Sequence, residues 1–319
     1  MKILYVDSGN VVSDTYMYQY YGDIYRELIK IADIHLYQGR LTSVDPLVQN
    51  GIDCVIFGLG YFTQTDPNVY QKIDGLDMSN IIKVCMLHKP QTMLSEKLNF
   101  CKINNFDLLF DHHLTYKENN KKVARKAVRF WFSATPEIYH PRQVSKIYDV
   151  GFSGASHAGN KISGPTQDLR NRIHEKLQRA KLNIFWNSNK QDDLTYRIPS
   201  VEAYATKINE SNIWIATTGP TLDVSPRYFE VMLSKTLLMC NDMPQEYEGV
   251  FIDGFNCVTF KNDLSDFDDK LLYYLNNIEE RQEIIERGYN YTINNHTCKH
   301  MALKILNEIK EIQNYEKAL

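Results

Sequence analysis

The feature that most constrains this chain is a regular alternation of short apolar runs with longer, helix-length segments. The apolar runs lack a strict alternation of polar and apolar residues, as expected for parallel strands that are covered by helices on both faces. Repeated strand–helix–strand units of this kind predict an α/β fold with parallel sheets and right-handed crossovers.

The apolar runs fall into two series. The first series lies at residues 2–7, 33–37, 53–58, 81–87, 106–110 and 127–132, and the second at residues 147–154, 181–186, 212–218, 236–240 and 257–260. The segment between them, Ser133 to Lys146, is polar and contains two prolines, which is typical of a linker. We therefore predict two consecutive doubly wound domains, at residues 1–142 and 143–299. A helix at residues 300–319 follows, with an apolar stripe of Met301, Ile305 and Ile309.

Composition narrows the class of protein. The 319 residues are 43% hydrophobic and 24% charged, with a net charge of -3, which argues against a general nucleic-acid binder. The most basic stretch, Asn119 to Phe130, fits a solvated face better than a phosphate-binding track. No run approaches the ~20 apolar residues of a membrane span, and the first strand begins without an apolar signal region. We expect a cytoplasmic protein whose six cysteines are buried free thiols.

Ligands bind open α/β sheets beyond the carboxyl ends of the strands, and two such sheets facing each other would form a cleft suited to a small molecule. The first strand is followed by Ser8, Gly9 and Asn10, which form either an ordinary turn or an acceptor-binding loop. The fourth is followed by His88, which is either a structural histidine or a group that binds a sugar hydroxyl or moves a proton.

The fifth strand is followed by His112 and His113, which we expect to contact an acceptor. Adjacent side chains do not converge on one metal ion, so a metal site is not predicted there. In the second domain, Ser153, Gly154 and Ala155 form a small-residue turn whose N–H groups can approach a phosphate. Its glycines lack the spacing of a dinucleotide fingerprint, which argues against NAD.

Arg227 and Glu230 are the most informative pair in the second domain. They are three residues apart and share one face of a short predicted helix, for which Ser225 is the expected cap and Pro226 the first residue. The helix start and the Arg227 fork would bind phosphate groups, and Glu230 would accept hydrogen bonds from two ribose hydroxyls. The alternative is a surface ion pair.

Three further residues complete the expected donor site. Thr218 and Gly219 end the preceding strand, and Tyr228 lies between Arg227 and Glu230.

The segment from residue 205 to residue 297 contains a series of motifs in a fixed order. They are R-x-F-E from Arg227 to Glu230, G-x-N-x-V-x-F from Gly254 to Phe260, and N-x-E-E-R from Asn277 to Arg281, followed by Gly288. This series resembles the C-terminal half of GT-B glycosyltransferases. It is most similar to the group that includes the spore-maturation protein CgeB and the glycosyl transferases of group 1.

The resemblance implies a GT-B fold and transfer of a hexosyl or pentosyl group from a nucleoside-diphosphate sugar to a glycan, protein or small-molecule acceptor. It implies no bound metal and no cofactor besides this co-substrate. Carried over, Glu230 binds the donor ribose and Arg227 the diphosphate. The expected catalytic residues are Arg227 and, from its place after the fourth strand, His88. The helix at residues 300–319 is then expected to pack back on the N-terminal domain.

Two positions depart from the family pattern. Leu222 stands where many retaining members have a second glutamate, and Lys235 stands where a glycine usually ends the helix. Two alternatives to transfer remain open at this point. One is a GT-B sugar-nucleotide epimerase or hydrolase, and the other is a non-catalytic module that binds a nucleotide sugar or a glycan.

Overall fold

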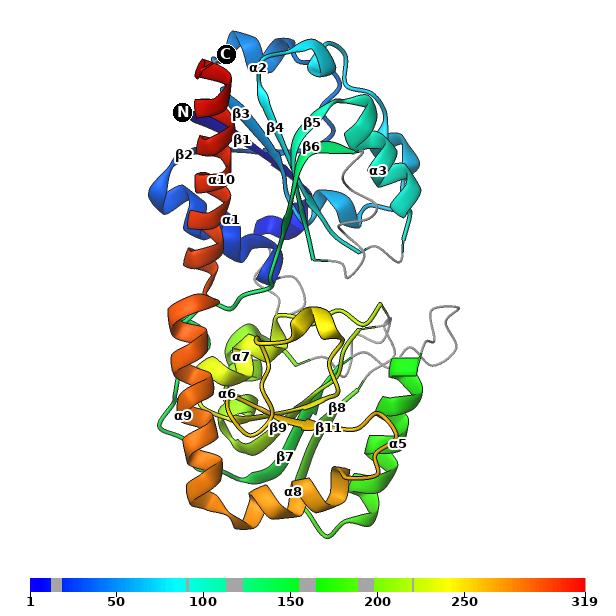
Figure 1. Cartoon of the computed structure of the whole chain (residues 1–319), viewed down its shortest axis with the longest axis vertical. Coiled ribbons are helices and arrows are strands. Elements are labelled where there is room, and N and C mark those ends of the chain that lie inside the picture. The colour runs from blue at the N-terminus through cyan, green and yellow to red at the C-terminus, as the bar shows by residue number, and fades with distance from the viewer. Residues whose placement is uncertain are drawn as a thin grey trace. The chain divides into compact units, whose positions relative to one another are not determined.

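The computed structural model describes residues 1–12, 19–89, 92–112, 123–154, 165–188, 198–219 and 221–318. The chain forms two compact units (Figure 1): unit 1 is Met1–Trp131 with Cys298–Leu319, and unit 2 is Phe132–Thr297. Each unit is built on a parallel sheet with helices, so the predicted fold class is confirmed. The division follows Trp131, ahead of the expected position at residue 142. The linker belongs to unit 2 because the Ala134 amide donates to the carbonyl oxygen of His296 at 3.2 Å.

Unit 1 contains a six-stranded sheet in the order β2-β1-β3-β4-β5-β6, and all pairs are parallel. Its strands are β1 (Lys2–Asp7), β2 (Asp33–Gln38), β3 (Cys54–Phe57), β4 (Ile82–Leu87), β5 (Phe106–Asp111) and β6 (Ala124–Arg129). The chain winds from β1 outward to β2 and then returns to β3 on the other side. The carboxyl ends of β1 and β3 therefore define a topological switch point, the usual place for a ligand in such sheets.

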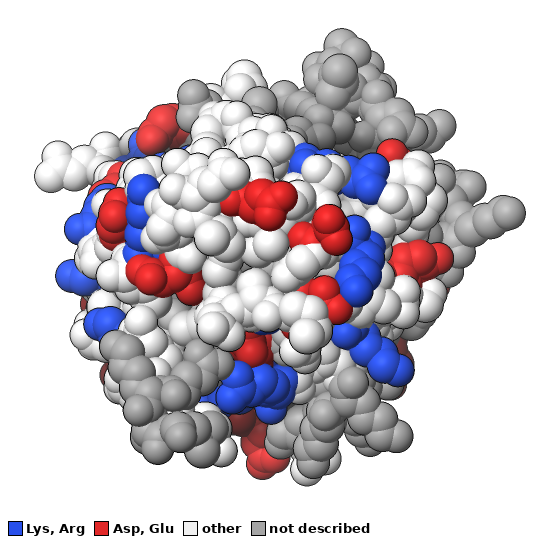
Figure 2. Space-filling model, turned by 90° about the horizontal axis from the view of Figure 1, so that it is seen from above, with Lys and Arg blue, Asp and Glu red and all other residues white. Residues whose placement is uncertain are grey.

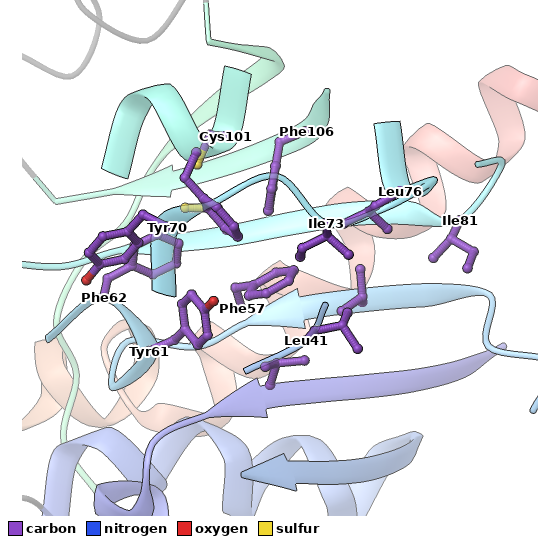
Figure 3. Packing of buried hydrophobic residues seen from close by; sticks show 14 of the residues in the cluster. Leu41, Phe57, Tyr61, Phe62, Tyr70, Ile73, Leu76, Ile81, Cys101 and Phe106 are labelled. Atoms are coloured by element: carbon purple, nitrogen blue, oxygen red, sulfur yellow. The ribbon is translucent and has the colours of Figure 1, made fainter. Parts of the chain in front are cut away.

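The helices of unit 1 are α1 (Gln19–Ile31), α2 (Asp45–Gln49), α3 (Leu94–Ile103) and α10 (Cys298–Ala318). Helices α1 and α10 pack on each other, and α3 lies against the other side of the sheet (Figure 1). Figure 3 shows the core on the α3 side, where Phe57 of β3 lies among Tyr61, Phe62 and Tyr70 from the segment that follows. The Phe57 and Tyr61 rings are 5.0 Å apart in an edge-on contact, a favourable arrangement for aromatic pairs.

Strand β6 differs from its predicted position. The apolar run at 127–132 predicts a strand there, but β6 spans Ala124–Arg129 and is only partly buried. An edge strand tolerates charged residues, and here they form ion pairs: Lys126 with Glu308 and Glu311 of α10, at 2.5 and 2.8 Å. Arg125, which pairs with Asp107, and Lys126 of the basic stretch are therefore engaged in structural ion pairs.

Unit 2 contains a five-stranded parallel sheet in the order β11-β10-β9-β7-β8. Its strands are β7 (Tyr148–Ser153), β8 (Ile184–Asn187), β9 (Ser211–Ala216), β10 (Leu237–Asn241) and β11 (Val258–Phe260). Its helices are α5 (Pro165–Arg179), α6 (Val201–Asn209), α7 (Arg227–Leu233), α8 (Phe267–Asn276) and α9 (Ile278–Asn295). Helices α5 and α8 share a core cluster with Ile213 and Ile215, whereas Trp214, between them, contacts Tyr204 of α6. The alternation along β9 therefore places helices on both faces.

The sequence predicts a side-chain cap at the start of α7 and an unusual residue, Lys235, at its end. Pro226 precedes the first helical residue, but the Ser225 hydroxyl has no hydrogen-bond partner among the described residues, so the predicted side-chain cap is wrong. At the other end, Lys235 is left-handed with φ 49°, and the Lys235 and Thr236 amides donate to the carbonyls of Met232 and Val231. These two bonds form a Schellman motif with lysine in the place that glycine favours. The Lys235 ammonium group is held by Glu286 at 2.7 Å, which offsets part of the backbone cost.

The surface shown in Figure 2 carries acidic and basic side chains that are interspersed, without an extended field of one sign among the coloured residues. No described helix is long and apolar enough to cross a membrane. All six cysteines are buried and free, as predicted.

Candidate active site

The carboxyl edge of the unit 2 sheet brings together most of the predicted donor residues. Strands β7 and β9 are neighbours, but the chain reaches β9 only after passing through β8 on the far side. The switch point of unit 2 therefore lies between the end of β7, at Ser153 and Gly154, and the end of β9, at Thr217 and Thr218. Of the predicted turn, Ser153 is buried and Gly154 half-buried, whereas Ala155 lies outside the described residues.

The end of β9 is held by side chains from the next strands. Asn241, at the end of β10, accepts a hydrogen bond from the Thr218 amide at 2.9 Å and donates to the Asn262 side-chain oxygen at 3.0 Å. These bonds fix the backbone at Thr218. Gly219 follows, and its amide donates to the Asp223 carbonyl at 2.8 Å, which closes the loop between β9 and α7.

Arg170 of α5 is a site residue that the sequence analysis did not single out. Its side chain is 6% exposed, and its Nε donates to the Thr217 hydroxyl at 2.8 Å. A Cβ atom added at Gly154 would lie 3.6 Å from its guanidinium carbon, so Arg170 reaches the end of β7 as well as that of β9. Burial and then the charge of Arg227 lower the pKa of Arg170 from 12.5 to about 10. Two guanidinium groups therefore face the same switch point.

Arg227 begins α7, and its Nε donates to the Tyr204 hydroxyl of α6 at 3.3 Å. Arg227 and Glu230 are half-buried, which leaves part of each side chain open to a ligand. Tyr228 differs from them: it is fully buried against Phe251, with ring centroids 5.2 Å apart, and its hydroxyl has no hydrogen-bond partner in the described parts of the chain. Tyr228 is therefore a core residue that supports α7 and does not face a ligand. Helix α7 has only seven residues, so its dipole adds little to the two arginines.

A cavity of about 250 Å³ adjoins this edge. Its walls are Asp168, Leu169 and Arg172 of α5, Thr218, Leu222, Asn241 and Asn262. Leu222 is 42% exposed and left-handed with φ 63°, an unusual conformation for a branched residue. The position where the resemblance implies a second glutamate thus carries a strained, solvent-facing leucine.

The carboxyl edge of the unit 1 sheet holds the other predicted residues. His88 follows β4 and His112 follows β5; both are buried, and their ring centroids are 5.3 Å apart. The Tyr20 hydroxyl lies 3.0 Å from His88 Nε2 and fixes the ring. His113 is outside the described residues. The structure thus brings His88 and His112 together within unit 1.

Two lysines surround this histidine pair. Lys97 of α3 is fully buried, and its Nζ donates to the carbonyls of His88 and Lys89, both at 3.0 Å. Burial and then the nearby charge of Lys89 lower the pKa of Lys97 from 10.5 to about 8. Neither lysine was identified from sequence, although a lysine inside the apolar segment of α3 was a detectable signal.

The switch point of unit 1 lies at Asp7, next to the predicted loop. The Asp7 carboxylate is 1% exposed and accepts hydrogen bonds from the amides of Ser8 and Gly60, at 2.6 and 3.2 Å. Burial raises the pKa of Asp7 from 3.8 to about 7. Gly9 and Asn10 lie in a 3-10 helix, Gly9–Val12, rather than in an irregular loop. Asn10 is described by its backbone alone.

The side chains that could coordinate a metal ion are dispersed. Within the described ranges, no three His, Cys, Asp or Glu residues lie close enough together to hold one. Arg170 and Arg227 carry positive charge near the unit 2 switch point.

Comparison with known proteins agrees with this geometry. A family model described as "Glycosyl transferase-like" matches residues 166–307, a segment that includes Arg170, Arg227 and Glu230. No curated protein sequence matches the chain.

Several solved structures share the fold over the full length of the chain. Sucrose-phosphate synthase from Thermosynechococcus elongatus superposes with a TM-score of 0.65 at 9% identity and covers 99% of this chain and 100% of its own. Anabaena HepE in complex with UDP gives 0.61 at 11% identity, over 98% and 100% of the two chains. A glycosyltransferase from Rickettsia africae gives 0.58 at 14% identity, over 98% of each.

The fold is that of GT-B glycosyltransferases, and residues 166–307, which contain the arginines of the switch point, match the glycosyl transferase-like family model. The resemblance noted in the sequence is confirmed at this level, while membership of the narrower CgeB group stays a prediction.

Proposed function

We propose that the protein transfers a sugar from a nucleoside-diphosphate sugar to an acceptor, without a bound metal ion. One observation carries the proposal: two arginines, Arg170 and Arg227, converge at the switch point of unit 2. Guanidinium groups match the geometry of phosphate oxygens and bind them with paired, charge-assisted hydrogen bonds. A diphosphate is a dianionic group that can accept hydrogen bonds from both arginines.

The same residues would assist the chemistry. During transfer, the bond between the anomeric carbon and the diphosphate oxygen breaks, and an acceptor oxygen forms the new bond and loses its proton. Negative charge grows on the departing diphosphate, and fixed positive groups aimed at it lower the barrier. Arg170 is well suited to this role because the Thr217 hydroxyl and the surrounding core hold it in place. The two arginines would supply the charge that a metal ion supplies elsewhere.

The remaining donor contacts follow from the same edge of the sheet. Glu230, one turn beyond Arg227, would accept hydrogen bonds from the ribose hydroxyls. The backbone of Ser153, Gly154, Thr218 and Gly219 would contact the phosphates and the sugar. Anabaena HepE, which has this fold, has been crystallised with UDP and with UDP-glucose, which supports a nucleotide sugar as the donor.

On the acceptor side, we assign binding to Ser8, Gly9, Asn10, His88 and His112 of unit 1. His88 is the candidate that takes the acceptor proton, because Tyr20 fixes its ring at a strand end.

Calorimetric titration with UDP and with uridine tests the donor site. Arg170→Met and Arg227→Ala should each weaken UDP binding by about 2–3 kcal/mol and change uridine binding little, because the phosphates are their partners. Glu230→Ala should weaken both ligands by about 2–4 kcal/mol, because two charge-assisted hydrogen bonds to the ribose are lost.

The matched control is Arg179→Met, which removes an exposed arginine from the same helix as Arg170. It should bind UDP like the wild type. If Arg170→Met and Arg227→Ala also did so, the diphosphate site would not be at this switch point.

A further inference from the structure

The loop after β4 in unit 1 holds a lysine whose backbone is strained and tightly fixed. Lys89 adopts a left-handed conformation with φ 50°, which is costly for a residue with a side chain. Its carbonyl oxygen accepts hydrogen bonds from the Lys97 ammonium group at 3.0 Å and from the amide and hydroxyl of Thr92, both at 3.1 Å. Strained residues held by several contacts are often found at functional sites, which makes Lys89 a candidate functional residue.

The side chain of Lys97, which holds this loop, has unusual surroundings. Lys97 is fully buried, and within the described residues its Nζ bonds only to the carbonyls of His88 and Lys89. A buried ammonium group normally has a carboxylate partner, because desolvation penalises an unpaired charge. Here Lys97 instead adds a second positive charge beside Lys89.

Lys89 has no ion pair with the described residues. Its side chain is half-buried, and burial lowers its pKa. None of the described Asp and Glu side chains pairs with it, and Asp111, which ends β5 at the same edge, is itself 1% exposed. Lys89 is therefore a half-buried cation on a fixed backbone, which an anion would stabilise.

Two histidines lie at the same edge of the sheet as Lys89. His88 directly precedes Lys89, and the His112 ring centroid lies 5.3 Å from that of His88. Imidazole N–H groups and an ammonium group together suit the oxygen atoms of a phosphate or a carboxylate. A metal cation would be repelled by Lys89 and Lys97.

We propose that the carboxyl edge of β4 and β5 binds an anionic group, phosphate or carboxylate, with Lys89 as its charged ligand and Lys97 as a positioning residue. The assignment of this group to the acceptor rests on the transfer function proposed above; the anion site itself does not. The acceptor class would then be a phosphorylated or carboxylated molecule rather than a neutral sugar.

The test follows the NMR signals of the His88 ring, assigned with a His88→Gln variant, during titration with inorganic phosphate, glucose 6-phosphate, glucuronate and glucose. Phosphate and glucose 6-phosphate should shift the signals if the site prefers phosphate, and glucuronate should shift them if it prefers carboxylate. Glucose should not shift them in either case. Lys89→Gln should weaken the response about tenfold, equivalent to about 1.4 kcal/mol. Lys89→Arg should restore most of it. Lys72→Gln, which removes a lysine already paired with Asp77, should have no effect.

Two outcomes overturn the proposal. One is an equal response in Lys89→Gln and the wild type, and the other is a response to glucose as strong as that to glucose 6-phosphate. The Arg227→Ala variant distinguishes the anion site from the donor site. In this variant the His88 signals should still respond to phosphate. If the response were lost in Arg227→Ala but kept in Lys89→Gln, the anion would bind at the donor site. A protein that does not bind UDP but keeps the Lys89-dependent response would contradict the transfer function and still support the anion site.

Discussion

At the residue scale, the structure assigns roles to side chains whose surroundings are unusual for their type. Arg170 occupies a helix position three residues before Ile173 and seven before Leu177, both of which face the core. A charged residue in line with a buried stripe was the signal that could have identified it. Lys97 is similar, since it lies on α3 next to the buried Phe100 and Cys101. The partners of these charged groups, by contrast, are distant in sequence, as Thr217 is from Arg170.

Asp7 should make the stability of unit 1 depend on pH. Its pKa is about 7 in the folded chain and 3.8 in the reference state, so between these values the folded chain holds a proton that the unfolded chain has lost. The free energy of unfolding should therefore fall as pH rises from about 4 to about 7, by roughly 2–4 kcal/mol. Asp7→Asn, which cannot ionise, should flatten this slope in urea unfolding curves. A slope of opposite sign, or an unchanged slope in the variant, would contradict this role.

At the element scale, α10 is the clearest case of a pattern that predicts packing. The stripe of Met301, Ile305 and Ile309 is buried, and Lys304 on the same helix donates to the Arg129 carbonyl at 2.8 Å. The C-terminal helix is thus part of unit 1, although the whole of unit 2 lies between it and the rest of unit 1 in the chain.

Two substitutions in α10 measure how much its apolar stripe contributes to the stability of unit 1. Ile305→Ala should destabilise unit 1 by about 2–5 kcal/mol, because it leaves a cavity at a fully buried position. Leu303→Ala, on the same helix but 41% exposed, should cost about 0.5 kcal/mol or less. Denaturant unfolding of the two variants provides the comparison. Equal effects would mean that the stripe does not carry the packing of α10.

At the scale of the whole molecule, the proposed chemistry uses arginine where other enzymes use a metal ion. The UDP affinity should therefore be the same in EDTA as in Mn²⁺ or Mg²⁺, measured by calorimetry on the full chain. If either ion tightened UDP binding tenfold, equivalent to about 1.4 kcal/mol, the metal-independent assignment would be wrong.

The sequence by itself determined the fold class, because helical and strand periodicities are local properties of the chain. It also located the strand ends, and with them Ser153, Thr218, His88 and His112, because loops at the carboxyl ends of parallel strands are where ligands bind. Only the tertiary structure decided which of these residues meet. Arg170 reaches Thr217 across 47 positions of sequence, and Lys97 folds back on His88, since such contacts depend on strand order and helix placement. Burial, which shifts the pKa of Asp7 and separates Tyr228 from Glu230, is likewise a property of the packed chain rather than of any local pattern.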